Sequence, residues 1–246
     1  MESANPTTTL PVVESRRLTL DDVQISPVTA RDLLSLAEGY YASFPASWHR
    51  RMEPPTKSSV PVSVRAARFA KRMEPWLKSP DTKWMKATLR SDPEQRVIGH
   101  AGWLMPVDDD GRRFIKHHWT RGAVEQLGWK EMMGWSDAEV EEMWEHVDVE
   151  RWERSFKGLE EIREKRMRGI RHWFLAPLWT LPEYQGRGVA SLLLKETLDL
   201  ADATDPPTAV YLESMPEARK VYEHFGFKGI PGCDIQMVRT GPQTKP

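Results

Sequence analysis

The stretch from residue 172 to residue 203 constrains the fold more than any other part of the chain. It opens with the bulky, mostly apolar run 172–181, which suits a β-strand covered on both faces. Pro177 inside this run predicts a bulge or an unpaired edge, because proline cannot donate a hydrogen bond to a β-ladder. Two glycines, Gly186 and Gly188, follow, and the leucines after them recur with the spacing of an amphipathic helix. A strand, a tight turn and a helix are therefore expected in direct succession.

Such a succession can bind an anion through its main chain. The first amides of a helix have no acceptor within the helix, and the helix dipole places partial positive charge there. Gly186 and Gly188 allow the backbone to turn and approach phosphate oxygens, and the small Ala190 keeps the mouth of the helix open. We therefore expect main-chain N–H groups to hold a diphosphate here, with Gln185 and Arg187 as further contacts.

The rest of the chain predicts a mixture of strands and helices. Residues 45–59 contain three prolines and are expected to be irregular. Residues 107–170 are charged and helical in period, which indicates an insertion or lid. We expect residues 1–17 to be a flexible N-terminal segment and residues 18–246 to form a single domain. The expected strands are 22–27, 84–89, 97–105, 172–181, 209–212, 227–230 and 235–239, and the expected helices are 29–41, 62–77, 149–167, 189–203 and 216–225.

Composition excludes several classes of function. The 35 basic and 36 acidic side chains leave a net charge of -1, which argues against a nucleic-acid or anionic-lipid partner. The single cysteine, Cys233, cannot form an intramolecular disulfide. No apolar run reaches the length of a membrane span, and we expect a cytoplasmic protein without membrane contact. His117 and His118 follow three aspartates, but adjacent histidines point to different sides of regular structure, so no metal site is expected.

Aromatic and basic side chains also gather outside the glycine turn. The tryptophans of the middle stretch are expected to pack on the core, with an aromatic substrate pocket as the alternative. The basic residues of the helix 62–77 are interpreted as a solvated face rather than a phosphate site. The tryptophans are Trp119, Trp129, Trp135, Trp144 and Trp152, and the basic residues are Arg65, Arg68, Lys71 and Arg72.

Two segments resemble the Gcn5-related N-acetyltransferase (GNAT) superfamily. The run from Leu181 to Leu193, which contains Gln185-Gly186-Arg187-Gly188-Val189-Ala190, is similar to the acetyl-CoA loop of that family. The run from Ala218 to Phe227 is similar to the helix and Gly-Phe turn that follow the family's fifth strand. The resemblance implies an α/β (α+β) fold with a mixed, mostly antiparallel central sheet flanked by helices, here with a large helical insertion.

The same resemblance implies a site for acetyl-CoA as co-substrate. In this family the fourth strand separates from the fifth, and the pantetheine arm of the cofactor adds to its edge. Met215 stands where relatives often have Asn or Ser, and Ser214 is expected to compensate. The implied cofactor-binding residues are Leu178, Trp179, Thr180, Gln185, Gly186, Arg187, Gly188, Val189, Ala190, Ser191 and Ser214.

The resemblance also assigns a general acid, while the general base stays open. Tyr222 aligns with a tyrosine that lies beside the cofactor sulfur in many relatives, and a phenol can protonate the thiolate leaving group. Many relatives carry a carboxylate on the fourth strand, but residues 172–181 contain none. His172 and His100 are candidate bases, and Glu213 is a further one.

These features favour transfer of an acetyl or other acyl group from acetyl-CoA to a primary amine by direct attack on the thioester. We expect a small-molecule amine as the acceptor. The alternatives are a protein or peptide N-acetyltransferase, for which the glutamates of residues 139–145 could form an acidic groove, and a non-catalytic CoA-binding protein. A homodimer is possible.

Overall fold

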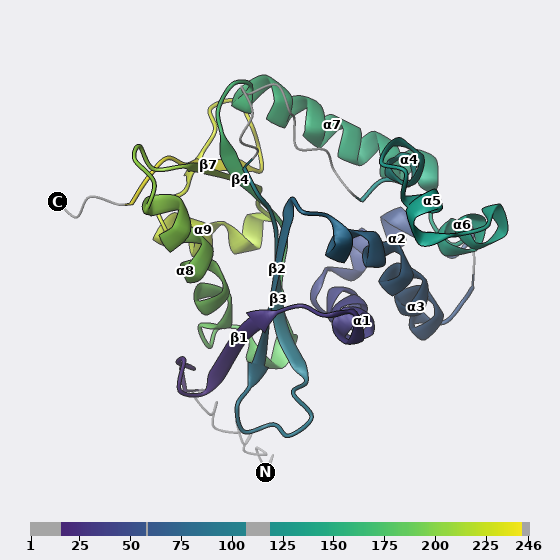
Figure 1. Cartoon of the computed structure of the whole chain (residues 1–246), viewed down its shortest axis with the longest axis horizontal. Coiled ribbons are helices and arrows are strands. Elements are labelled where there is room, and N and C mark those ends of the chain that lie inside the picture. Colours follow the sequence, from purple (N-terminus) through teal and green to yellow (C-terminus); the bar gives the residue numbers. More distant parts are fainter. Residues whose placement is uncertain (1–15, 58, 107–118, 243–246) are drawn as a thin grey trace, which may run out of the picture.

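The computed structural model describes residues 16–57, 59–106 and 119–242 (Figure 1). The expectations for residues 1–15 and for the histidine pair beside the aspartates lie outside the described residues. Within the described residues no helix is long and apolar enough to cross a membrane.

A seven-stranded sheet forms the centre of the described structure. Its order is β1-β2-β3-β4-β5-β7-β6, and β4 with β5 is the parallel pair among antiparallel ones. This arrangement confirms the expected mixed, mostly antiparallel sheet. The strands are β1 (Val23–Pro27), β2 (Thr82–Leu89), β3 (Val97–Leu104), β4 (His172–Thr180), β5 (Ala209–Glu213), β6 (Lys228–Gly229) and β7 (Gln236–Arg239).

The helices lie on both faces of the sheet. Figure 1 shows α8 and α9 on one side, and α1, α3 and α7 on the other. We call these the α8 face and the α7 face. The α-helices are α1 (Leu33–Ser43), α2 (Ala46–Met52), α3 (Val62–Met73), α4 (Arg121–Gln126), α5 (Trp129–Met133), α6 (Asp137–Trp144), α7 (Val149–Met167), α8 (Val189–Asp202) and α9 (Arg219–His224), with 3₁₀ turns at Ala30–Asp32, Glu74–Lys78, Pro182–Tyr184 and Pro216–Ala218.

The side chains of β4 alternate between the two faces. Trp173 and Leu175 join a core cluster with the α8 residues Val189 and Leu193, whereas Phe174 packs with Met167 of α7. Each face of β4 is therefore covered by a helix, which explains why its sequence is apolar almost throughout.

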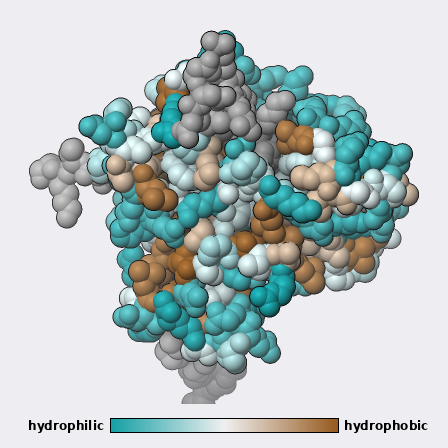
Figure 2. All heavy atoms as spheres, in the orientation of Figure 1, coloured by the Kyte–Doolittle hydropathy of each residue, from teal (hydrophilic) through white to brown (hydrophobic). Residues whose placement is uncertain are grey.

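The insertion packs on the α7 face through its aromatic residues. Its five tryptophans are each at least nine-tenths buried and share a core cluster with α1, α3 and Trp179 of β4. This confirms the expectation that they pack on the core. On the face of the molecule drawn in Figure 2, apolar side chains form separate patches among hydrophilic ones.

The structure corrects two expectations. Residues 46–52 form α2 instead of an irregular connection, because Pro45 precedes the first helical residue and Pro54 follows the last, so neither interrupts the helix. The basic residues of α3 are not a solvated face. Arg68 reaches Glu145 at 2.7 Å and Lys71 reaches Glu139 at 2.7 Å, both across the packing of α3 against α6.

Arg72, from the same helix, is buried among aromatic rings. Its guanidinium carbon lies 4.3 Å from the ring centre of Trp144 and 5.0 Å from that of Phe69. The aromatic faces offset part of the cost of burying this cation, so Arg72 helps to fix the insertion on α3.

Candidate active site

The strands β4 and β5 pair only at their beginnings. Their register runs from His172 with Ala209 to Leu175 with Leu212. Beyond Leu175, β4 continues to pair with β3 as far as Thr180. The side of β4 that faces β5 is thus an open edge over its second half, and the two strands separate at the carboxyl end of β5.

A bulge in β4 lies at the start of this open edge. The register with β3 shifts between Ala101 and Trp103, so that Ala176 and Pro177 together face Gly102. A Cβ on Gly102 would lie 2.9 Å from the carbonyl oxygen of Ala176 and from Cδ of Pro177, so a glycine is needed there. The bulge that Pro177 predicted is present.

The direction of the main-chain groups beyond the bulge follows from the ladder. Leu181 N–H donates to the carbonyl of Ile98 at 3.0 Å, and hydrogen-bonded pairs alternate with non-bonded ones between antiparallel strands. The N–H groups of Leu178 and Thr180 therefore face the open edge. The carbonyl of Thr180 also faces away from β3, where it accepts from the side chains of Ser43 and Gln185, each at 3.1 Å.

The glycine turn brings the chain from this edge to the start of α8. Gly186 and Gly188 have φ angles of +71° and +89°, which L side chains rarely adopt. No side chain caps α8, so its first amides are not satisfied by a side-chain acceptor. A Cβ on Gly186 would meet nothing within 4 Å, which leaves the backbone accessible on that side.

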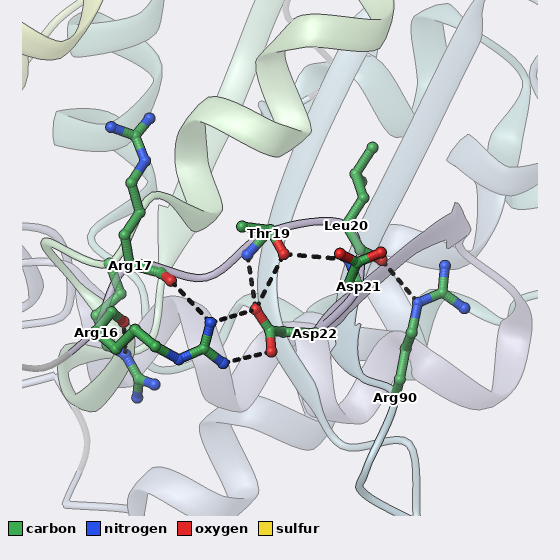
Figure 3. Close-up of polar contacts among 8 residues, drawn as sticks. Arg16, Arg17, Thr19, Leu20, Asp21, Asp22 and Arg90 are labelled. Carbon is green, nitrogen blue, oxygen red and sulfur yellow. Dashed lines mark hydrogen bonds and ion pairs between the residues drawn. The ribbon is translucent and has the colours of Figure 1, made fainter.

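Residues far away in the sequence lie against the same turn. Leu18 N–H donates to the carbonyl of Arg187 at 2.8 Å, and Nε of Arg187 donates to the carbonyl of Arg16 at 3.3 Å. Nε of Arg17 lies 3.1 Å from where a Cβ of Gly188 would stand. Figure 3 shows Arg16 directed at Asp22, whereas Arg17 extends away from that carboxylate. Arg17 thus adds a positive charge beside the turn, which sequence reasoning missed because nothing local connects it to Gly188.

Tyr222 lies on the α8 face. It is 7% exposed and packs edge-on against Phe227, with a ring-centre separation of 5.8 Å. Burial raises the pKa of its phenol, so the hydroxyl stays protonated and able to donate at neutral pH.

The two candidate histidines lie near opposite ends of β4. His172 pairs with Ala209 at the start of β4, and His100 faces Trp179 near its end. Nδ1 of His172 lies 2.6 Å from the carbonyl of Ile170, and Nδ1 of His100 lies 2.9 Å from that of Met85. Burial lowers the pKa of each imidazole to about 4. Because the two histidines lie near opposite ends of β4, the structure does not bring them together.

Glu213 ends β5 where the two strands separate. Its Oε1 is buried and makes no direct hydrogen bond among the described residues. Burial raises the pKa of this carboxyl to about 7, while the nearby cation of Arg163 acts in the opposite direction.

Comparison with known proteins shows which family part of the chain resembles. Residues 128–237 match the model of the acetyltransferase (GNAT) domain. This segment, less than half of the chain, is similar to that domain. The match begins in the insertion, at α5, and ends in β7, so it contains the whole strand, turn and helix unit.

Solved acetyltransferase structures are similar to the chain. A histone acetyltransferase HPA2-related acetyltransferase from Corynebacterium glutamicum has a TM-score of 0.51 and 18% identity, over 91% of this chain and 98% of that one. A GNAT family N-acetyltransferase from Escherichia coli, solved with CoA, has a TM-score of 0.43 and 16% identity, over 88% and 80% of the two chains. No curated protein sequence matches the chain.

Several residues predicted to bind the cofactor direct their side chains into the interior of the protein. Trp179 packs on α1, where a Cβ on Gly39 would lie 2.1 Å from its Cη2. The hydroxyl of Ser214 donates to the carbonyl of Met215 at 2.8 Å, and Val189 is 1% exposed in the core. These side chains are therefore engaged within the chain, whereas Ala190 and Ser191 lie partly exposed in the first turn of α8.

Proposed function

We propose that the chain is an acetyl-CoA-dependent N-acyltransferase that acetylates the primary amine of a small molecule. One observation carries the proposal: the open edge of β4 leads through Gly186 and Gly188 directly to the uncapped start of α8. In this proposal residues 18–246 form one acyltransferase unit, into which residues 107–170 are inserted. A cytoplasmic location and a homodimer stay predictions.

The length and chemistry of coenzyme A match the two parts of this surface. The amides of the pantetheine arm would pair with the main chain of Leu178 and Thr180, as an added strand pairs with a sheet edge. The diphosphate would accept hydrogen bonds from the first amides of α8, with the guanidinium groups of Arg17 and Arg187 adding positive charge. Acetyl-CoA is therefore the proposed co-substrate.

The transfer itself needs a nucleophile, an oxyanion contact and an acid. The lone pair of the amine attacks the thioester carbon, and a main-chain N–H of β4 holds the carbonyl oxygen as it gains negative charge. As the C–S bond breaks, the hydroxyl of Tyr222 gives its proton to the sulfur. The nitrogen loses one proton to a base as the amide forms, and exchange with water returns a proton to Tyr222, so that the products are an amide and free CoA.

A small amine is favoured over a protein acceptor because the acidic residues of α6 are engaged. A basic peptide would need an open acidic groove, but Glu139 pairs with Lys71, Glu141 pairs with Arg121, and Glu142 and Glu145 both lie near Arg68. Each of these carboxylates thus already lies within 4 Å of a cation of the chain.

The test measures binding and turnover separately. Calorimetry with acetyl-CoA is expected to give saturable binding to the full chain, and a panel of small amines, with lysine peptides for comparison, is assayed for release of the CoA thiol. A chain that does not bind acetyl-CoA refutes the proposal. Binding without turnover on any amine supports a non-catalytic CoA-binding protein instead, and turnover only on peptides supports the protein N-acetyltransferase.

The role of Tyr222 is tested in the same assay. Tyr222→Phe keeps the buried ring and removes only the hydroxyl, so acetyl-CoA binding is expected to persist while turnover falls by about 10-fold or more. An unchanged rate would show that Tyr222 is not the acid.

A further inference from the structure

Glu213 lies at the point where β4 and β5 stop pairing. The last pair between β4 and β5 joins Leu175 to Leu212, and Glu213 is the next residue. On its other side Glu213 pairs with Gln236 of β7, so its backbone is held in the sheet. The sheet thus fixes Glu213 at the point where β4 and β5 separate, next to the edge of β4 on which the pantetheine arm is proposed to bind.

The side chain of Glu213 and the ring of Tyr222 lie on opposite faces of the sheet. Leu212 and Tyr222 share the core cluster of the α8 face, while Tyr211 packs with Met167 and Phe174 on the α7 face. Because side chains alternate along a strand, Glu213 faces the same way as Tyr211. The proposed acid and this carboxylate therefore belong to opposite faces of the sheet.

Two of the charged side chains around Glu213 belong to the insertion. Arg163 and Glu160 approach Glu213 from α7, and Tyr211 lies near it on β5. Burial lowers the pKa of His172 on β4, and the positive charge of Arg163 lowers it further. Cys233, in the segment between β6 and β7, lies near Tyr211. Arg163 is fully buried, with its guanidinium carbon 4.0 Å from the ring centre of Phe174.

This setting suits a group that gains and loses a proton near neutral pH. Burial disfavours the charged carboxylate, and the cation of Arg163 partly restores it, so that the pKa of Glu213 lies at about 7. A base with such a pKa is ionised in part at neutral pH and can accept a proton from the amine nitrogen, which becomes acidic as it bonds to the thioester carbon. His100, by contrast, faces Trp179 at the far end of the open edge.

We propose that Glu213 is the general base of the transfer and that Arg163, from α7, is its positioning residue; both assignments rest on the proposed function. The acceptor nitrogen forms its bond to the thioester carbon and loses one proton to the carboxylate of Glu213. The C–S electron pair leaves with the sulfur, which takes the proton of Tyr222. Glu213 then releases its proton to water, and Tyr222 takes a proton back from water.

The experiment compares Glu213→Gln, Glu213→Asp and wild type in the full chain. With Gln, kcat is expected to fall by about 100-fold or more, while the Kd for acetyl-CoA stays within about 2-fold. With Asp, part of the rate is expected to return, because the carboxylate is kept and only its reach is shortened. The wild-type profile of kcat/KM against pH is expected to decline below about pH 7, and this decline disappears with Gln.

A matched control and a second measurement make the result decisive. Glu161→Gln removes an exposed carboxylate of the same helix, which lies 4.0 Å from Nζ of Lys157, and is expected to keep the wild-type rate within about 3-fold. Difference ¹³C NMR of the glutamate carboxyls, wild type minus Glu213→Gln, reads the titration of Glu213 directly, without any acceptor. A wild-type chain that turns over no amine refutes the proposed function. An active wild type with an equally active Glu213→Gln, or a Glu213 resonance that titrates below about pH 5, refutes the base alone.

Discussion

Replacing Glu213 with glutamine is predicted to make the protein more stable in alkaline solution while it makes the enzyme slower. The carboxyl has a pKa of 4.5 without the fold and about 7 within it. Each pH unit between these values corresponds to about 1.4 kcal/mol, so the ionised carboxylate lowers the free energy of unfolding by about 3 kcal/mol.

The sign of the effect follows from proton binding. The folded state holds this proton more tightly than the unfolded state does, so the free energy of unfolding falls as pH rises from 4.5 to about 7 and is level above. Glutamine carries no charge at either pH. The variant is therefore expected to exceed wild type by about 1 kcal/mol or less at pH 5 and by about 3 kcal/mol at pH 8.

Urea unfolding followed by tryptophan fluorescence measures this difference at pH 5 and pH 8. Glu161→Gln, an exposed carboxylate on the same helix as Arg163, is the control and is expected to stay within about 0.5 kcal/mol of wild type at both pH values. A Glu213→Gln variant that is less stable than wild type at pH 8, or whose gain does not grow between pH 5 and pH 8, would refute the reasoning.

Two further substitutions test the surroundings of the site. Arg163→Met removes the cation that favours the ionised form of Glu213, so the acidic decline of kcat/KM is expected to move to higher pH; an unmoved profile would contradict this role. Gly39→Ala places a methyl group 2.1 Å from Cη2 of Trp179 and is expected to cost about 1 to 3 kcal/mol in urea unfolding. Gly158→Ala, a helical glycine with nothing within 4 Å of the added Cβ, is the control and is expected to gain up to about 1 kcal/mol. Equal effects of the two alanines would contradict the packing described for Trp179.

The sequence was most informative where local periodicity decides the structure. The expected helix 149–167 coincides with α7, and the expected strand 172–181 differs from β4 by one residue. In both, the spacing of apolar side chains carries the signal, and Pro177 marks the bulge because its missing N–H is a local property.

The errors arose where the position of a residue decides its effect. Prolines in residues 45–59 were counted as helix breakers, although Pro45 lies just before α2. The cations of α3 were assigned to solvent, since their partners on α6 are distant in the sequence and only packing brings them close.

The residues of the candidate site also fall into two groups: those that the local sequence suggests and those that only the tertiary structure brings to the site. The glycine turn and Tyr222 belong to contiguous motifs, and the sequence is sufficient to suggest them. Arg17 and Glu213 gain their interest from tertiary structure alone: one from the contact between the N-terminal segment and Gly188, the other from the point at which β5 parts from β4. The fourth strand carries no carboxylate, whereas the fifth strand ends on one at the point where the two strands separate.

The central claim is that main-chain amides at the start of α8 hold the diphosphate of acetyl-CoA, and one pair of variants tests it most directly. Gly186→Asn and Gly186→Asp have nearly the same shape, and both residues tolerate a positive φ better than other side chains do. Calorimetry is expected to give a Kd for Asn close to that of wild type and a Kd for Asp weaker by about 10-fold or more, because a carboxylate near the diphosphate costs about 1 to 3 kcal/mol. Equal affinity of the Asn and Asp variants for acetyl-CoA would contradict the claim.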